Sequence, residues 1–564
     1  MTPAQRLGEH LFALYGDEVG SAVLPRLYEL IEHHRRQLGE IRPVAPIDRL
    51  HEADAVLITY ADQVTSANEP PLETLHRFIG GHLAEAVTGV HLLPFYPYSS
   101  DDGFSVIDYA SVDPDLGDWS HLTSLADDFR LMFDAVINHV SAQSRWFQGF
   151  LEGRPPYRDY FVTVDPAVDL SQVVRPRATP LLTPFDTADG VKHVWTTFSS
   201  DQVDLNYSNP AVLLDVIDVL LEYVGRGADI LRLDAVTYLW KEIGTDCANH
   251  PKAHRIVKLI RSVLEAACPR VVLLTESNVP HEENVAYFGD GTDEAQMVYN
   301  FALPPLMLDA FLTGDATALK HWAAPLATPS DETAFFNFLA SHDGIGVRPV
   351  EGILGEAGIE RLVRATKERG GLVSYRRGSD GADSPYELNI TYFDALNDPA
   401  GGESEHVQVN RFLAAHAAML SLAGVPGLYI HSLLGSRNYL AGVERTGRSR
   451  IINREKFTLS RLEAELEDAA GRRRRVLDGL TRLLRARTYD PAFHPQCEQE
   501  ILESPPQVFA IRRAGEVYCL HNVAPRPGRM ALRGDFTDLV SGEEVRLSGS
   551  LALPPLEARW LRAR

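Results

Sequence analysis

The sequence predicts an α/β fold, a (β/α)8 barrel of the TIM type with inserted subdomains and a C-terminal β-domain. Eight short and almost continuously apolar segments recur along the chain, as expected for parallel strands buried on both faces. Helical patterns such as 211–224 and 253–267 separate most of these segments, and this alternation is typical of a barrel. The chain has 564 residues, 45% of them hydrophobic, which is enough for such a core and for further domains.

The eight strands are placed by their apolar residues. We expect them at 55–58, 89–93, 131–137, 230–233, 271–274, 297–299, 335–339 and 425–430. Two of the intervals between them are too long for a simple crossover. Residues 140–206 therefore predict an inserted domain after the third strand, and residues 346–397 predict an inserted subdomain after the seventh.

The domain boundaries follow from these intervals. Residues 1–52 read as an N-terminal helical extension that ends in a proline-containing linker, and the barrel comprises 53–139, 207–345 and 398–487. From about residue 488 the pattern changes to β-branched residues with a period of two. This pattern predicts a C-terminal β-domain at 488–564.

Charge and composition exclude several classes of partner. With 54 Lys and Arg against 77 Asp and Glu, the net charge of −23 argues against a nucleic-acid or membrane partner. Four scattered cysteines form neither a disulfide framework nor a thiolate metal site. His250 and His254 have the spacing of a helical metal pair, but no third ligand is evident and a helix cap is the favoured interpretation. Acidic residues interrupt the first apolar stretch, so a cytoplasmic protein without a signal peptide is predicted.

Ionisable residues follow several of the predicted strands. Arg232 and Asp234 lie two apart at the end of the fourth strand, so their side chains leave the same face. Glu276 follows the fifth strand and Asp343 follows the seventh, while His139 follows the third. Each of these residues alone is more often a helix cap, a salt-bridge partner or a structural histidine. Together, at the carboxyl ends of successive barrel strands, they predict an active site with three carboxylates.

The four strand ends resemble the signature segments of the α-amylase-type glycoside hydrolases. The matching segments are 134–139, 232–234, Glu276 and 342–343. The resemblance implies that Asp234 is the nucleophile, Glu276 the general acid/base and Asp343 the stabiliser of the transition state. The chemistry agrees, because retaining glycosidases use one carboxylate as a nucleophile and one carboxyl group with a raised pKa as a proton donor.

A closer resemblance, from about residue 54 almost to the end, is to the sucrose phosphorylase group. It rests on long stretches that include HLLPFYPYSSDDGFSVIDY, VWTTFSSDQVDLN, SHDGIGV and RIINR. It implies a pocket for one glucose unit, closed by Asp101 and Arg450 against the 4-hydroxyl. For Phe104 and Phe198 core packing is the alternative interpretation. The pocket residues that the resemblance implies are Asp101, Phe104, His139, Phe198, Gln202, Arg232, Tyr238, His342 and Arg450.

In that group inorganic phosphate is a co-substrate that replaces water, so the resemblance implies α-glucose 1-phosphate as a product. It implies no cofactor and no metal. Arg177 matches a phosphate-binding arginine, although a surface ion pair is the alternative, and Tyr386 and Glu387 fall in the acceptor loop of 346–397. The resemblance also allows a homodimer.

The chain departs from the sucrose enzymes where the acceptor would bind. Glu387 stands in place of a glutamine, Ser277 follows the acid/base, and the first 52 residues are additional. The helical N-terminal extension and the stretches YPYSSDDGFSVIDY, TESNVPHEENVAYFG and DGADSPYELN look most like the members that cleave 2-O-α-D-glucosyl-D-glycerate with phosphate and release D-glycerate. Cleavage of sucrose 6'-phosphate is the main alternative, followed by sucrose or glucosylglycerol phosphorolysis and by hydrolysis or transglucosylation. Arg376 and Arg377 are candidates for meeting the charge of an anionic acceptor.

Overall fold

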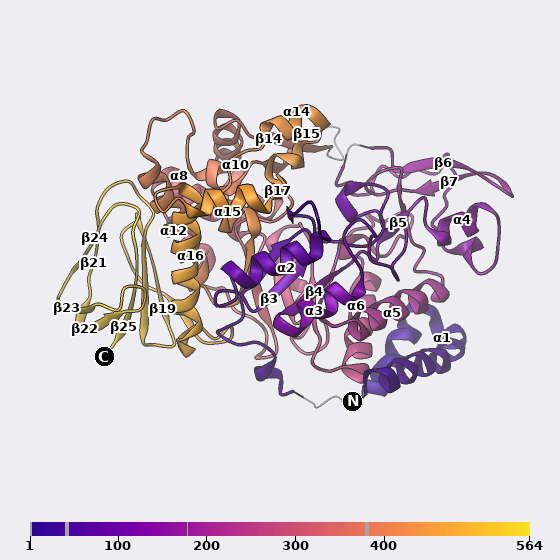
Figure 1. Ribbon diagram of the computed structural model, residues 1–564. Coiled ribbons are helices and arrows are strands. Elements are labelled where there is room, and N and C mark those ends of the chain that lie inside the picture. Colours follow the sequence, from indigo (N-terminus) through magenta and orange to yellow (C-terminus); the bar gives the residue numbers. More distant parts are fainter. Residues whose placement is uncertain (1–2, 40–43, 178, 378–382) are drawn as a thin grey trace.

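The computed structural model describes residues 3–39, 44–177, 179–377 and 383–564, and its centre is a closed barrel of eight strands (Figure 1). Neighbouring strands pair in parallel around the ring, and the last strand closes it against the first. This architecture confirms the predicted fold class. In ring order the strands are β1 (Val56–Thr59), β3 (Gly89–Leu92), β4 (Arg130–Ala135), β9 (Ala228–Leu233), β10 (Val272–Thr275), β11 (Met297–Tyr299), β12 (Ala334–Asn337) and β16 (Val425–Tyr429).

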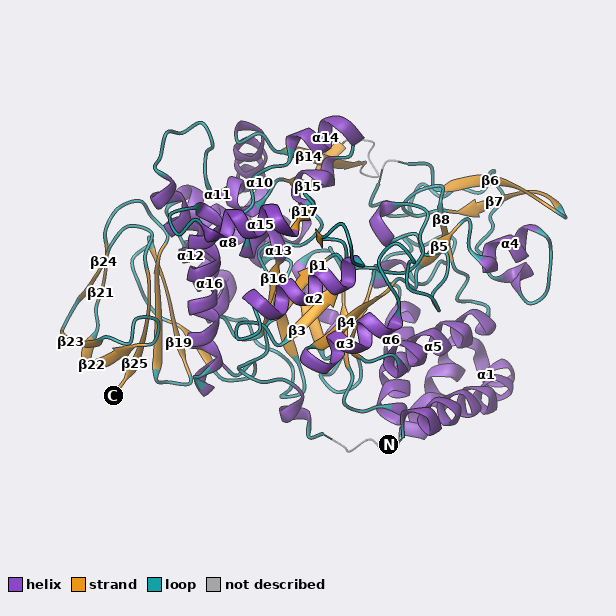
Figure 2. Ribbon diagram, viewed as in Figure 1, coloured by secondary structure: helices purple, strands orange, loops and turns teal. Residues whose placement is uncertain are grey.

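Helices surround the barrel and cover its apolar strands (Figure 2). Local sequence sets where they begin. Asn209 caps α5, and His250 accepts a hydrogen bond from the backbone of Lys252 at the start of α6, so His250 is a helix cap as favoured from the sequence. The outer helices include α2 (Pro71–His82), α3 (Trp119–Asp128), α5 (Pro210–Gly225), α6 (Pro251–Ala267), α8 (Leu303–Thr313), α9 (Thr317–Ala323), α12 (Glu405–Ser421), α15 (Leu459–Glu467) and α16 (Arg472–Thr488).

The N-terminal segment forms α1 (Pro3–Leu38), which packs beside α5 and α6 (Figure 1). It bends at Gly16, whose φ of 79° lies in the left-handed region that glycine tolerates. His34 Nε2 lies 2.7 Å from Asp218 Oδ1 on α5, and Arg6 contacts Glu265 on α6. The segment therefore supports the outside of the barrel, away from the ends of the strands where the site lies.

Two long segments lie at the carboxyl ends of the strands. After β4 the chain forms β5 (His139–Ser141), α4 (Arg145–Leu151), the hairpin of β6 (Leu182–Thr187) and β7 (Gly190–Trp195), and β8 (Gln202–Asp204), which pairs with β5. After β12 it forms α10 (Glu351–Glu368) and a sheet in the order β13 (Ile345–Gly346), β15 (Asp383–Asn389), β14 (Leu372–Arg377). Shorter helices follow, among them α11 (Tyr392–Leu396), α13 (Ile430–Leu433) and α14 (Leu440–Thr446).

The C-terminal part is an antiparallel sheet at the opposite end of the molecule from α1 (Figure 1). Trp560 is fully buried and its ring lies 4.9 Å from that of Phe493, so the sheet is anchored to the segment that follows α16. In order across the sheet the strands are β18 (Gln499–Ile501), β19 (Val508–Arg513), β20 (Val517–Asn522), β25 (Ala558–Ala563), β22 (Arg533–Asp538) and β23 (Glu544–Ser548), with β21 (Gly528–Met530) paired to β24 (Leu551–Leu553).

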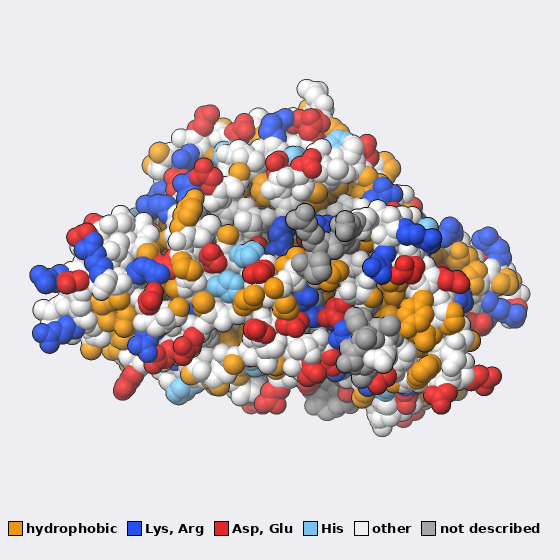
Figure 3. Space-filling model, turned by 90° about the horizontal axis from the view of Figure 1, so that it is seen from below, with side chains coloured by type: hydrophobic (Ala, Val, Ile, Leu, Met, Phe, Trp, Pro, Cys, Tyr) orange, Lys and Arg blue, Asp and Glu red, His pale blue; other side chains and the backbone are white. Residues whose placement is uncertain are grey.

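Charged side chains of both signs are interspersed over the face shown in Figure 3. No helix in the described part of the chain is long and apolar enough to cross a membrane.

Candidate active site

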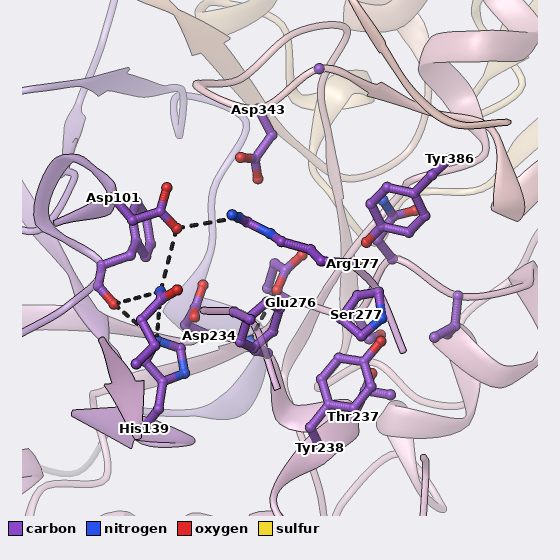
Figure 4. A pocket seen from close by; sticks show the side chains of 18 of the residues that line it. Asp101, His139, Arg177, Asp234, Thr237, Tyr238, Glu276, Ser277, Asp343 and Tyr386 are labelled. Atoms are coloured by element: carbon purple, nitrogen blue, oxygen red, sulfur yellow. Dashed lines mark hydrogen bonds and ion pairs between the residues drawn. The ribbon is translucent and has the colours of Figure 1, made fainter. Parts of the chain in front are cut away.

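The three carboxylates predicted from the sequence meet in one pocket at the carboxyl ends of the barrel strands (Figure 4). Asp234 directly follows β9, Glu276 directly follows β10, and Asp343 lies in the segment after β12. In parallel register Leu233 lies opposite Thr275, so the residues after these two strands are neighbours in space. Figure 4 shows Asp234 and Glu276 side by side, with Asp343 across the cavity from them.

Asp234 is held by the arginine two residues before it. Arg232 Nη1 lies 2.9 Å from Asp234 Oδ1 and also contacts Asp134 on the adjacent β4. Asp134 is in turn 2.7 Å from His91 Nε2. Since all of these groups are buried, the network fixes the direction in which the Asp234 carboxylate points.

Glu276 receives a backbone hydrogen bond from the turn after β9. Ala235 adopts a left-handed conformation with φ 51° and ψ 38°, which is uncommon for a residue with a side chain. Its N–H donates to Glu276 Oε2 at 3.0 Å. The strained turn therefore couples the two carboxyl groups, since the residue that follows Asp234 positions Glu276.

The surroundings of the carboxyls separate their pKa values. Burial together with the negative charges of Asp234 and Asp343, only partly offset by Arg232, raises the pKa of Glu276 to about 7. Burial also raises the pKa of Asp234, and Arg232 opposes that rise. Because the guanidinium touches Asp234 and not Glu276, the pair loses its first proton from Asp234. One carboxylate and one carboxylic acid near neutrality is the arrangement that general acid and nucleophile require.

Asp343 is kept ionised by two arginines. Arg450 Nη1 lies 2.5 Å from its Oδ1 and Arg454 Nη2 lies 3.6 Å from the same oxygen. Burial opposes ionisation, but these guanidinium groups outweigh it and hold the pKa of Asp343 well below its usual range. Asn453 Nδ2 fixes the backbone by donating to the Asp343 carbonyl at 3.0 Å.

Polar groups that are connected by hydrogen bonds line one end of the pocket. Gln202 Nε2 donates to Asp101 Oδ2 at 3.3 Å and to the Phe104 carbonyl at 3.1 Å, and His139 Nε2 donates to the same carbonyl at 2.9 Å. Arg177 Nη2 lies 3.2 Å from Asp101 Oδ2. Burial opposes ionisation of Asp101, but the charges of Arg177 and Arg450 lower its pKa to about 2, so it is an acceptor for hydroxyl groups.

The loop that carries Asp101 is held in an unusual conformation. Asp101 and Asp102 both have left-handed backbones, with φ of 54° and 51°. The buried Arg454 lies 2.5 Å from Asp102 Oδ2, and Arg448 contacts the same carboxylate. Since this conformation costs free energy for residues other than glycine, the two ion pairs are what stabilise the loop at the pocket.

The two phenylalanines predicted for the pocket are both part of its wall. Phe104 stacks on the His342 ring, with centroids 4.9 Å apart and an angle of 5° between the planes. Phe198 lies between His139 and Tyr238, at 5.2 Å and 5.6 Å. Burial lowers the pKa of His342 to about 3, so its imidazole is neutral and behaves as part of this aromatic wall.

The opposite side of the pocket carries tyrosines (Figure 4). Tyr386 on β15 and Tyr238 after β9 both line it, together with Asn278. Burial raises the pKa of Tyr238 to about 12, so its hydroxyl is a hydrogen-bond donor at neutral pH. Ser277 Oγ donates to Asn284 at 2.8 Å and is therefore engaged within the protein.

Most of the residues predicted for the site line this pocket, and two do not. Arg232 is buried and contacts Asp234, as described above, and Glu387 is buried behind Arg450. The Arg450 Nη2 donates to Glu387 Oε2 at 2.6 Å, and the Gly344 N–H donates to Oε1 at 2.8 Å. The predicted residues that line the pocket are Asp101, Phe104, His139, Arg177, Phe198, Gln202, Asp234, Tyr238, Glu276, His342, Asp343, Tyr386 and Arg450.

Sequence reasoning missed Asn278 and Arg454. Asn278 is two residues beyond Glu276, and this period-two spacing is a signal that could have found it. Arg376 was a candidate for an anionic acceptor, but it lies 3.1 Å from Glu351 and is already paired. The side chain of Arg377 lies outside the described residues. Within the described ranges no three His, Cys, Asp or Glu side chains form a cluster that could hold a metal ion.

Comparison with known proteins places this chain in a family. Residues 85–346 match the model of the alpha amylase catalytic domain. The chain is 51% identical to a glucosylglycerate phosphorylase of Allomeiothermus silvanus, with 99% of this chain and 98% of the relative covered. The chain belongs to the alpha-amylase family, in the branch of the glucosylglycerate phosphorylases.

Other members of the family agree with this placement. The glucosylglycerate phosphorylase of Escherichia coli is 44% identical, with 99% of this chain and 100% of the relative covered. Among solved structures, sucrose 6F-phosphate phosphorylase from Thermoanaerobacter thermosaccharolyticum superposes with a TM-score of 0.74 at 27% identity, covering 88% of this chain and 97% of that one.

Proposed function

We propose that this protein is a retaining glycoside phosphorylase that reversibly cleaves 2-O-α-D-glucosyl-D-glycerate with phosphate, giving α-D-glucose 1-phosphate and D-glycerate. The observation that carries the proposal is the 51% identity, over 98% of its length, to a relative named glucosylglycerate phosphorylase. The geometry supports it, because an acid with a pKa of about 7 lies beside an ionised carboxylate in one pocket.

In the first step Glu276 donates its proton to the glycosidic oxygen while Asp234 attacks the anomeric carbon. D-glycerate leaves with that proton, and the glucosyl group is held as a β-ester on Asp234. The pKa of Glu276 suits this role, since an acid is most effective when its pKa is close to the working pH. Asp234 suits the role of nucleophile because Arg232 keeps it ionised and fixed in direction.

In the second step phosphate attacks the ester from the face that D-glycerate left, and Glu276 accepts the proton from the incoming phosphate. Two inversions at the same carbon retain the α configuration. Arg177 is the proposed phosphate ligand, because its guanidinium reaches into the pocket and offers paired N–H donors to a tetrahedral oxyanion (Figure 4). Tyr386 is proposed to contact the phosphate or the acceptor from the opposite side.

The remaining groups are proposed to hold one terminal glucose unit. Asp343 would bind ring hydroxyls and stabilise the positive charge that develops at the anomeric carbon. Asp101 and Arg450 would close the pocket at the 4-hydroxyl, where Gln202 and His139 add further donors and acceptors. Glu387 has a supporting place in this proposal, because it orients Arg450 from behind.

The test is release of phosphate from α-glucose 1-phosphate in the presence of D-glycerate, fructose, fructose 6-phosphate or glycerol. Release driven by D-glycerate supports the proposal. Release only with fructose 6-phosphate would replace the acceptor and favour a sucrose 6'-phosphate phosphorylase, while glucose formation without acceptor dependence would indicate a hydrolase. Asp234→Asn should abolish the release, and Asp229→Asn, at the far end of the same strand, is the matched control.

A further inference from the structure

Arg348 is a half-buried arginine that lacks a carboxylate partner in the described part of the chain. It follows β13 and begins a short 3-10 helix at Arg348–Val350. Its side chain is partly buried, and its Nε is buried without a hydrogen-bond partner among the described residues. Burying an unpaired cation costs free energy, so such a residue is expected where an anion is bound.

The segment that carries Arg348 lies directly behind the tyrosine side of the pocket. The N–H of Val347 donates to the Tyr386 carbonyl at 3.2 Å. Gly346 is packed so closely on Asn278 that a Cβ at this position would lie 2.6 Å from Asn278 Oδ1. Tyr386 and Asn278 both line the pocket, so the backbone on either side of them places Arg348 next to the region opposite the Asp101 end.

The positive charge of Arg348 has an electrostatic effect inside the pocket. Burial raises the pKa of Tyr238, and among the charges that act against this rise Arg348 has the largest effect. Arg348 itself is not one of the lining residues. Its influence on a bound molecule therefore acts through the field at Tyr238 and Asn278 and not through a contact present in this structure.

The other arginines around the pocket differ from Arg348 in being paired. Arg177 is paired with Asp101, Arg450 with Asp343 and Glu387, and Arg376 with Glu351. Each of these guanidinium groups already contacts a carboxylate within the protein. Within the described ranges Arg348 contacts no carboxylate, and its buried Nε has no hydrogen-bond partner.

We propose that Arg348 is a specificity-determining residue that makes the site prefer an acceptor with a carboxylate over a neutral polyol. The inference rests on the proposed function, since it concerns the second substrate of the same site. The carboxylate would lie at Tyr238, whose hydroxyl donates and is strengthened as a donor by the positive charge behind it. Asn278 Oδ1, which is buried without a partner among the described residues, would accept a hydrogen bond from an acceptor hydroxyl.

The test is a competition for the glucosyl-enzyme. α-D-glucosyl fluoride serves as the donor because it carries no phosphate, so Arg348 cannot act through the donor's charge. D-glycerate and glycerol are present together at equal concentrations, so the initial ratio of the two glucosides equals the ratio of their acceptor kcat/KM values. This ratio does not depend on how much of a variant is folded.

The wild type should favour D-glycerate, and Arg348→Gln should lower the ratio roughly tenfold, as expected for the loss of a nearby charge that is not in contact. Arg348→Lys, which keeps the charge, should retain most of the preference. Arg364→Gln, an exposed arginine on α10, should leave the ratio unchanged. Added salt should reduce the preference of the wild type more than that of Arg348→Gln.

Two outcomes would overturn the inference, and they differ in what they say about the proposed function. If the wild type favours D-glycerate and Arg348→Gln keeps the same ratio, Arg348 does not set specificity while the proposed function stands. If the wild type does not favour D-glycerate over glycerol, the proposed acceptor and the inference fail together.

Discussion

The raised pKa of Glu276 affects the stability of the folded protein as well as catalysis. The variant Glu276→Gln tests this effect. In the folded protein this carboxyl titrates near pH 7, compared with an ordinary value of 4.5. Between these two pH values the unfolded chain has lost the proton and the folded chain keeps it. Since the unfolded state binds fewer protons there, the free energy of unfolding falls as pH rises from about 4.5 to about 7.

The size of the effect follows from the shift. At 1.36 kcal/mol per pKa unit, a rise from 4.5 to about 7 corresponds to about 3 kcal/mol, fully lost above pH 7. Glutamine resembles the protonated side chain and removes this loss. For a chain of 564 residues that unfolds cooperatively, about 3 kcal/mol corresponds to a change in Tm of roughly 2 to 3 °C.

The assay is thermal unfolding of the wild type and Glu276→Gln at pH 5 and pH 8. The difference in Tm, variant minus wild type, should increase by that amount between the two pH values. Glu282→Gln, an exposed residue on α7 (His281–Val285), is the control and should show no such change. Equal pH dependence in the wild type and Glu276→Gln would refute the assignment of a raised pKa to this carboxyl.

Three further predictions follow from the same contacts. The kcat/KM for glucoside cleavage should fall above pH 7 as Glu276 loses its proton, and a pH profile that stays flat to pH 9 would contradict this. Arg177→Gln should raise the KM for phosphate roughly 10- to 100-fold, as for the loss of a charged hydrogen bond, while transfer to water from glucosyl fluoride persists; equal loss of both rates would contradict the role. Asp102→Asn should lower the free energy of unfolding by about 2 kcal/mol and raise the KM for α-glucose 1-phosphate, because the buried Arg454 loses the nearer of its two carboxylate partners. The exposed Asp108→Asn is the control, and an unchanged Tm would contradict the prediction.

The barrel and its catalytic edge could be predicted because local sequence patterns determine them. Strands buried on both faces read as apolar runs, and the carboxyl ends of parallel strands meet at one edge, so Asp234, Glu276 and Asp343 could be placed together from the sequence. The long-range ion pairs that hold the pocket residues in place could not be predicted. Glu387 meets Arg450 across 63 residues, and Asp102 meets Arg454 across 352 residues, and no periodicity reports such long-range pairs.

The same limit applies to the acceptor side. The sequence offered Arg376 and Arg377 as cations for an anionic acceptor, since both lie in the predicted inserted subdomain. In the structure Arg376 is paired with Glu351, and the residue left without a carboxylate among the described residues is Arg348, which lies in the same predicted subdomain but was not a candidate from the sequence. Whether an arginine is paired depends on where the nearby carboxylates lie, and only the folded structure shows their positions.

Mass spectrometry of Glu276→Gln tests whether the glucosyl group passes through a covalent ester on Asp234. With α-D-glucosyl fluoride the leaving group needs no proton, so the first step proceeds while the second is slow without a general base. The intact protein is expected to gain the mass of one glucosyl unit, and peptide mapping is expected to place this unit on Asp234. Addition to another residue, or no addition while the fluoride is consumed, would contradict the role of Asp234 as nucleophile.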